Sequence, residues 1–197
     1  PDRGYGGRFA NWIHDGDPQP YDSFGNGSAM RVSPVGYYAE SLDEALALAQ
    51  VSAEVTHNHP EGIKGAQATA AAIFLARQGE NKWEIRDYIE NTFGYNLSRT
   101  LDEIRPTFTF DETCQRTVPE AIICYLEGKD YEDVVRLAVT LAGDADTLAA
   151  IAGSIASATR DVTSEVTQRV ISLLSDEFCA TLLRFNELVA KREQEAK

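Results

Sequence analysis

Residues 141–158 read LAGDADTLAAIAGSIASA and join an acidic turn to a helix of small, apolar residues. Gly153 and several alanines let the backbone of such a helix approach its neighbours closely. A helix that is apolar on most sides belongs in the interior of a protein. The stretch therefore predicts a protein of closely packed helices, with an acidic turn held at the start of one of them.

Asp144, Asp146 and Thr147 bring two carboxylates and a hydroxyl to this helix start. In the non-helical entry to a helix, side chains two residues apart can converge on one point, which they do not do inside a helix. Such oxygen ligands suit Mg²⁺, Ca²⁺ or Mn²⁺ rather than zinc. Simple N-capping of the helix is the structural alternative for the same residues.

From Ser41 onward apolar residues recur at helical spacing. Ser41 and Glu44 form a capping box, and Pro60 suits the first turn of the next helix. Two amphipathic stretches follow near the end, at 166–174 and 178–189. We expect one all-α domain over residues 1–197, a compact orthogonal bundle of many helices. Further helix starts are expected at Asn81, Ser98, Thr117 and Asp130.

The stretch FGNGSAMR, residues 24–31, is a glycine-rich turn that runs into a helix. Gly25 and Gly27 allow close approach of a ligand to the backbone, and Asn26 and Ser28 offer polar contacts. Ser28 is also expected to cap the helix that follows. The turn suits an anion such as phosphate, since backbone N–H groups point outward there. An ordinary Gly-Asn-Gly turn has the same composition.

His57 and His59 flank Asn58 in a polar turn between two helices. Their spacing differs from the HExxH pattern of a zinc helix. Two roles are open for His57: contact with a ligand at a pocket rim, or capping of a helix end.

The chain carries 18 Lys and Arg against 31 Asp and Glu, a formal net charge of −13. This charge argues against nucleic acid or an anionic membrane as the main partner. The three cysteines form no CxxC pair, and the sequence has no membrane-spanning run and no signal peptide, so a cytoplasmic location is expected. A phosphate-bearing ligand would have to be held by backbone N–H groups or a metal ion.

Three stretches together resemble the ADP-ribosylglycohydrolase family. They are residues 25–36 (GNGSAMRVSPVG), 53–74 (AEVTHNHPEGIKGAQATAAAIF) and 143–156 (GDADTLAAIAGSIA), in the family's order. The resemblance implies an all-α fold, a binuclear Mg²⁺ site in which Mn²⁺ is also possible, and hydrolysis of the bond between ADP-ribose and a protein side chain or small acceptor. It matches Asp144, Asp146 and Thr147 to metal ligands, and Gly25, Asn26, Gly27, Ser28 and His57 to the ADP-ribose site.

Two departures from the family pattern stand out. Ala145 replaces a Ser or Thr between the two aspartates. The family's Thr-Asp-Asp triplet and early acidic residue do not occur, so we expect an N-terminally incomplete domain whose catalytic carboxylate lies upstream. Two functions follow: an Mg²⁺-dependent ADP-ribosyl hydrolase, or a non-catalytic ADP-ribose-binding or structural relative. A calcium loop is disfavoured, because D-A-D-T-L lacks its glycine and glutamate. The linkage cleaved and the oligomeric state are not predicted.

Overall fold

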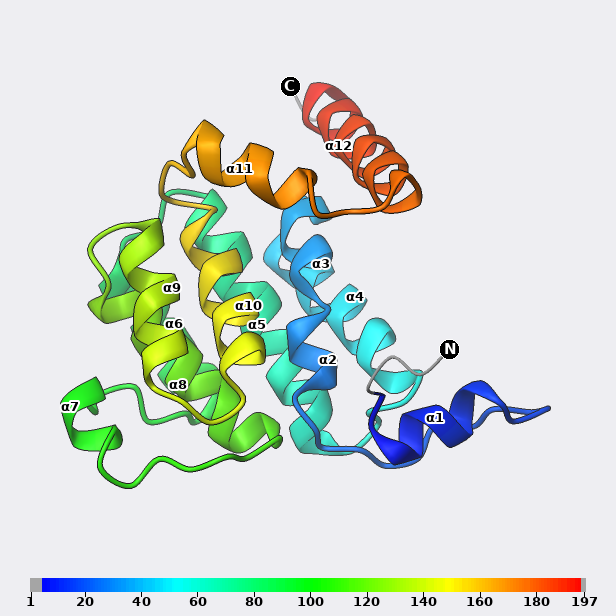
Figure 1. The fold of residues 1–197 in the computed structure, drawn as a ribbon, viewed down its shortest axis with the longest axis horizontal. Helices are drawn as coiled ribbons and strands as arrows, with labels where there is room; N and C mark the ends of the chain where they lie inside the picture. Colours follow the sequence, from blue (N-terminus) through cyan, green and yellow to red (C-terminus); the bar gives the residue numbers. More distant parts are fainter. Residues whose placement is uncertain (1–4, 196–197) are drawn as a thin grey trace.

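The computed structural model describes residues 5–195, and in this range the only β pairing is one isolated bridge between Gly25 and Thr113. The predicted all-α class is confirmed for the described range (Figure 1). The prediction of a single, N-terminally incomplete domain over residues 1–197 stays a prediction. The helices are α1 (Gly7–Ile13), α2 (Gly27–Met30), α3 (Ser33–Tyr38), α4 (Leu42–Glu54), α5 (Pro60–Arg77), α6 (Lys82–Phe93), α7 (Leu101–Ile104), α8 (Cys114–Glu127), α9 (Tyr131–Thr140), α10 (Ala145–Ala156), α11 (Ser164–Ile171) and α12 (Asp176–Glu195).

Helix α5 lies at the centre of the bundle, with α2, α3 and α4 against one side and α6, α8 and α10 against the other (Figure 1). Eleven of its 18 residues are buried, and most of these are alanine or glycine. Small side chains let the neighbouring backbones come close, so α5 is covered nearly all round. Helix α10 packs in the same way against α2, α5, α8 and α9.

Two glycines show how tight these contacts are. A Cβ atom on Gly65 of α5 would lie 2.4 Å from the Sγ of Cys114 on α8. A Cβ atom on Gly36 of α3 would lie 2.6 Å from the Cβ of Ile73 on α5. No side chain fits at either position without moving a helix, so these glycines set the spacing of α3, α5 and α8.

Several predicted helix starts are confirmed. Ser41 caps α4 by accepting from the Glu44 N–H at 3.1 Å, Asn81 forms a full capping box with Glu84, and Asp130 caps α9. The prediction for Ser98 is wrong, because Thr100 caps α7 and Ser98 donates to Glu90 Oε1 at 3.2 Å instead. Glu103 completes the box by accepting from the Thr100 N–H, which fixes the start two residues later.

The predicted start of α8 at Thr117 is also wrong, since the helix begins at Cys114. The reason is tertiary. The Cys114 N–H donates to the Phe24 carbonyl at 2.9 Å, and the Asn26 N–H donates to the Glu112 carbonyl at 2.7 Å. This pairing with the 24–26 segment satisfies a free N–H at the start of α8, and Pro119 is then accommodated inside the helix.

Helices α11 and α12 lie at the end of the bundle reached by the C-terminal end of α10 (Figure 1). Helix α11 begins two residues before its predicted stretch, and α12 extends beyond 178–189 at both ends. Arg192 ties α12 to the bundle through Glu40 at 2.9 Å, Glu44 at 3.1 Å and the Tyr38 ring at 4.2 Å. No helix in residues 5–195 combines the length and apolar character needed to cross a bilayer.

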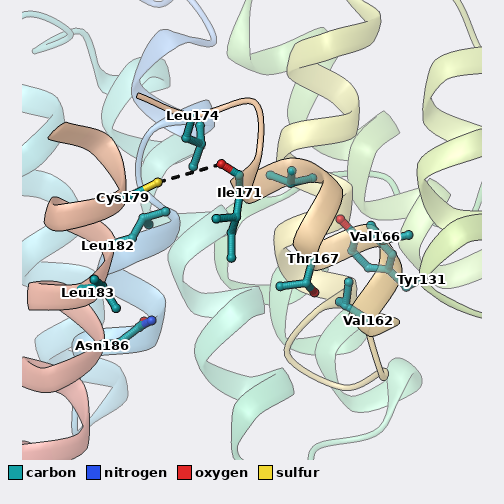
Figure 2. A pocket seen from close by; sticks show the side chains of 11 residues that line it. Tyr131, Val162, Val166, Thr167, Ile171, Leu174, Cys179, Leu182, Leu183 and Asn186 are labelled. Carbon is teal, nitrogen blue, oxygen red and sulfur yellow. Dashed lines mark hydrogen bonds between the residues drawn. The ribbon is translucent and has the colours of Figure 1, made fainter. Parts of the chain in front are cut away.

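An apolar groove of about 430 Å³ separates α11 from α12 (Figure 2). Val166, Leu174 and Leu182 are among the side chains that line it, with Tyr131 from the start of α9. It adjoins the C-terminal end of α10, whereas the predicted acidic turn is at the N-terminal end. The groove is therefore remote from the predicted site residues.

Candidate functional site

A tight left-handed turn places Asp144 at the start of α10. Ala142 and Gly143 both have positive φ angles, 69° and 68°. A Cβ atom on Gly143 would lie 2.6 Å from the Phe108 ring, so glycine is required there for space as well as for conformation. Asp144 occupies the N-cap position but makes no side-chain capping bond. Its carboxylate is therefore not used for the simple capping role.

Asn26 holds that carboxylate from the other side of the site. Its Nδ2 donates to Asp144 Oδ2 at 2.7 Å and to the Thr117 hydroxyl at 2.9 Å. Asn26 is only 6 % exposed, and 118 residues of sequence separate it from Asp144. The glycine-rich loop, α8 and the acidic turn thus meet at one amide group.

Asp146 and Thr147 complete the acidic turn. Asp146 is exposed in the first turn of α10, and its Oδ1 accepts from the Thr147 N–H at 2.9 Å. The Thr147 side chain is buried, with its hydroxyl 3.7 Å from Met30 Sδ on α2. Burial raises the pKa of the Asp144 carboxyl, the Asn26 hydrogen bond opposes that shift, and the nearby Asp146 adds to it.

This donor set suits one hard cation better than two. Mg²⁺ commonly takes one or two carboxylates and completes its shell with water and substrate phosphates. A cation beside Asp144 and Asp146 would also offset the repulsion between the two carboxylates. Among the described residues no group of three or more His, Cys, Asp or Glu side chains is placed to hold a metal. The residues present therefore fit a single Mg²⁺ but do not by themselves fit the binuclear site.

The Gly25–Ser28 loop lies between Asp144 and His57. A Cβ atom on Gly27 would lie 3.1 Å from His57 Nε2, and one on Gly25 would lie 3.6 Å from the same atom. Both glycines thus leave room beside the imidazole. The N–H group of Gly27, a partly exposed residue, finds no acceptor within residues 5–195, so it is available to a ligand.

Ser28 does not have its predicted capping role. The hydroxyl is fully buried and donates to the Gly62 carbonyl on α5 at 2.7 Å. Gly62 is itself closely packed, since a Cβ atom there would lie 2.5 Å from the Ser23 carbonyl oxygen. The side chain of Ser28 therefore anchors the loop to α5, and the residue as a whole is buried.

His57 lies in the turn between α4 and α5 and is buried, with 7 % of its surface exposed. Its Nδ1 lies 2.7 Å from the Thr56 hydroxyl, which also accepts from Arg31 Nη2 at 3.0 Å. Burial lowers the pKa of His57 to about 4, and the charges of Arg31 and Arg8 act in the same direction. The imidazole is neutral at physiological pH.

The structure brings the predicted Gly25–Ser28 loop, Asp144 and His57 into one region, and Asp146 and Thr147 follow Asp144 in the same turn. Local sequence patterns did not predict the roles of Thr117, Thr56 and Arg31. Thr117 bonds to Asn26, and Thr56 and Arg31 form the hydrogen-bonded chain to His57. Thr117 is 91 residues from Asn26, so no short motif joins the pair. Thr56 precedes His57 directly, and that adjacency was the one available signal.

Comparison with known proteins identifies the protein family of this chain. The family model for ADP-ribosylglycohydrolase matches residues 2–197, and the chain belongs to this family. A solved structure described as an ADP-ribosylglycohydrolase-related protein complex matches 93 % of this chain and 64 % of its own, with a TM-score of 0.62 and 25 % identity.

Among curated proteins, the chain is similar to ADP-ribosylarginine hydrolase Tri1 of Pseudomonas putida, at 30 % identity over 75 % of this chain and 40 % of that protein. It is also similar to human ADP-ribosylhydrolase ARH3, at 29 % identity over 69 % of this chain and 50 % of that protein. An uncharacterized protein of Archaeoglobus fulgidus is 31 % identical over 66 % of this chain and 47 % of its own length. The chain thus spans about half the length of the curated relatives it matches.

Proposed function

We propose that this chain binds ADP-ribose with Mg²⁺ and acts in hydrolysis of the glycosidic bond between ADP-ribose and a protein side chain or small acceptor. The observation that carries the proposal is the Asn26 amide, which joins the Gly25–Ser28 loop to Asp144 at 2.7 Å. Two sequence motifs, one that the family resemblance assigns to the metal and one that it assigns to ADP-ribose, therefore lie side by side.

The loop suits the diphosphate of ADP-ribose. The free N–H group of Gly27 is an anion donor that needs no basic side chain, which accords with a net charge of −13. Glycine at position 27 keeps the imidazole of His57 accessible from the loop. Backbone donors held by a buried anchor such as Ser28 are pre-organised, and so bind without a large ordering cost.

Asp144, Asp146 and Thr147 are the residues that would hold Mg²⁺. When bound, the ion would orient phosphate or ribose oxygens and favour a nucleophilic water. Asn26 keeps the Asp144 carboxylate turned toward the site, and Thr117 holds Asn26 in turn. Supports of this kind commonly change metal affinity by about 10- to 100-fold.

The test is calorimetric titration of ADP-ribose with and without Mg²⁺, on the wild type and on Asp146→Asn. We expect Mg²⁺ to strengthen binding in the wild type and to do so less in the variant. Asp43→Asn is the matched control, because Asp43 is also an exposed carboxylate in the first turn of a helix. Equal Mg²⁺ responses in Asp146→Asn and wild type would refute the metal assignment.

A second candidate is a protein that binds ADP-ribose without cleaving it. The favouring observation is that no group of three or more His, Cys, Asp or Glu side chains is placed to hold a metal within residues 5–195. Release of ADP-ribose from an ADP-ribosylated arginine or serine peptide separates the two functions, since only the hydrolase produces it. For both candidate functions we propose a cytoplasmic location, because all three cysteines are free thiols.

A further inference from the structure

A chain of hydrogen bonds runs from Arg31 through Thr56 to His57. Arg31 follows α2, and its Nη2 donates to the Ser52 carbonyl at 2.9 Å and to the Thr56 hydroxyl at 3.0 Å. The Thr56 oxygen lies 2.7 Å from His57 Nδ1. Thr56 is 2 % exposed, so water does not compete freely for its hydroxyl.

The direction of the bond between Thr56 and His57 follows from the donors and acceptors available. A guanidinium group only donates, so the Thr56 oxygen is the acceptor toward Arg31. The single hydroxyl proton of Thr56 has no other acceptor within residues 5–195 than His57 Nδ1. Because the buried imidazole is neutral, it carries one proton, and a ring nitrogen that accepts leaves that proton on the other nitrogen.

The second ring nitrogen faces the loop of the candidate site. His57 Nε2 has no hydrogen-bond partner within the described part of the chain. A Cβ atom on Gly27 would be 3.1 Å from it, which places the nitrogen at the inner wall of the Gly25–Ser28 loop. The Nε2–H group therefore lies beside Gly27, whose N–H group is also free.

We propose that Thr56 and Arg31 are positioning residues, which hold His57 with its proton on Nε2 so that the ring donates a hydrogen bond to a ligand oxygen at the Gly25–Ser28 loop. The identity of that oxygen, a diphosphate or ribose oxygen of ADP-ribose, rests on the proposed function. The position of the proton on His57 does not.

The proton position is measured in the free wild-type chain by two-bond ¹H–¹⁵N correlation of the imidazole. We expect a protonated Nε2 and an unprotonated, accepting Nδ1. Thr56→Val removes the hydroxyl with little change in shape, and Thr56→Ser keeps it. In Thr56→Val we expect a second population with the proton on Nδ1 and about 10- to 100-fold weaker ADP-ribose binding, the effect of one hydrogen bond to a charged group. Thr56→Ser should retain both wild-type properties.

Each outcome bears on a separate claim. A proton on Nδ1 in the wild type overturns the proposal whatever the affinity for ADP-ribose. Unchanged ADP-ribose affinity in a folded Thr56→Val chain overturns the positioning role. If the wild type carries its proton on Nε2 but binds no ADP-ribose, the proposed function fails and the ligand contact fails with it, while the proton assignment stands.

Discussion

Replacing Asn26 with alanine tests the contact on which the site is built. The substitution removes a 2.7 Å hydrogen bond to the Asp144 carboxylate and a 2.9 Å bond to the Thr117 hydroxyl. It leaves the backbone bond from Asn26 to Glu112 in place, and Asn26 makes no side-chain capping bond that would also be lost. The effect is therefore confined to the two amide contacts.

The magnitude follows from the kinds of bond involved. A hydrogen bond to a charged group contributes about 1.5–3 kcal/mol and a neutral one about 0.5–1.5 kcal/mol. Because Asp144 is only partly buried, water replaces some of the first contribution. We expect Asn26→Ala to lower the free energy of unfolding by about 2–4 kcal/mol.

Urea denaturation followed by circular dichroism measures this change, with two controls. Thr117→Val keeps the bond to Asp144 and removes two neutral bonds, the one from Asn26 and a 3.4 Å bond to the Asp111 carbonyl, and should cost about 1–2 kcal/mol. Asn58→Ala removes the exposed hydrogen bond from the Asp22 N–H to Asn58 Oδ1 and should change stability by less than about 1 kcal/mol. An Asn26→Ala effect no larger than that of Asn58→Ala would refute the claim that the amide holds the acidic turn.

Three further predictions concern packing, pH and the last helix. Gly62→Ala should destabilise the chain by about 1–3 kcal/mol in thermal unfolding, because its Cβ would meet the Ser23 carbonyl at 2.5 Å, whereas Gly16→Ala, with open space around it, should not. Burial lowers the pKa of His57 to about 4, so the unfolded chain takes up a proton on this residue before the folded chain does as pH falls. The free energy of unfolding should therefore drop by about 3 kcal/mol between pH 6.5 and 4, and urea denaturation of His57→Gln should lack this part of the loss. Arg192→Ala removes the contacts with Glu40, Glu44 and Tyr38, so hydrogen exchange in α12 should quicken while α5 stays protected; equal rates in α12 would contradict its attachment through Arg192.

Short-range patterns predicted much of the helical framework. The Asn81 capping box and the Asp130 cap are local, since each joins residues three positions apart, and the helix starts at both residues were correctly predicted. The errors at Ser98 and Thr117 arose where a competing contact decided the start. For Ser98 that contact is with Glu90, and for α8 it is the pairing of residues 24–26 with residues 112–114.

The sequence by itself determined the all-helical class, the small-residue interior of α5 and α10, and the residue types of the candidate site, because helical spacing and ligand chemistry are properties of neighbouring residues. Only the tertiary structure decided how those residues are used. It turned Asn26 toward Asp144, buried the Ser28 hydroxyl against α5, and joined Arg31 and Thr56 to His57. Contacts between residues as far as 118 positions apart form only when the helices pack, so no local spacing could encode them.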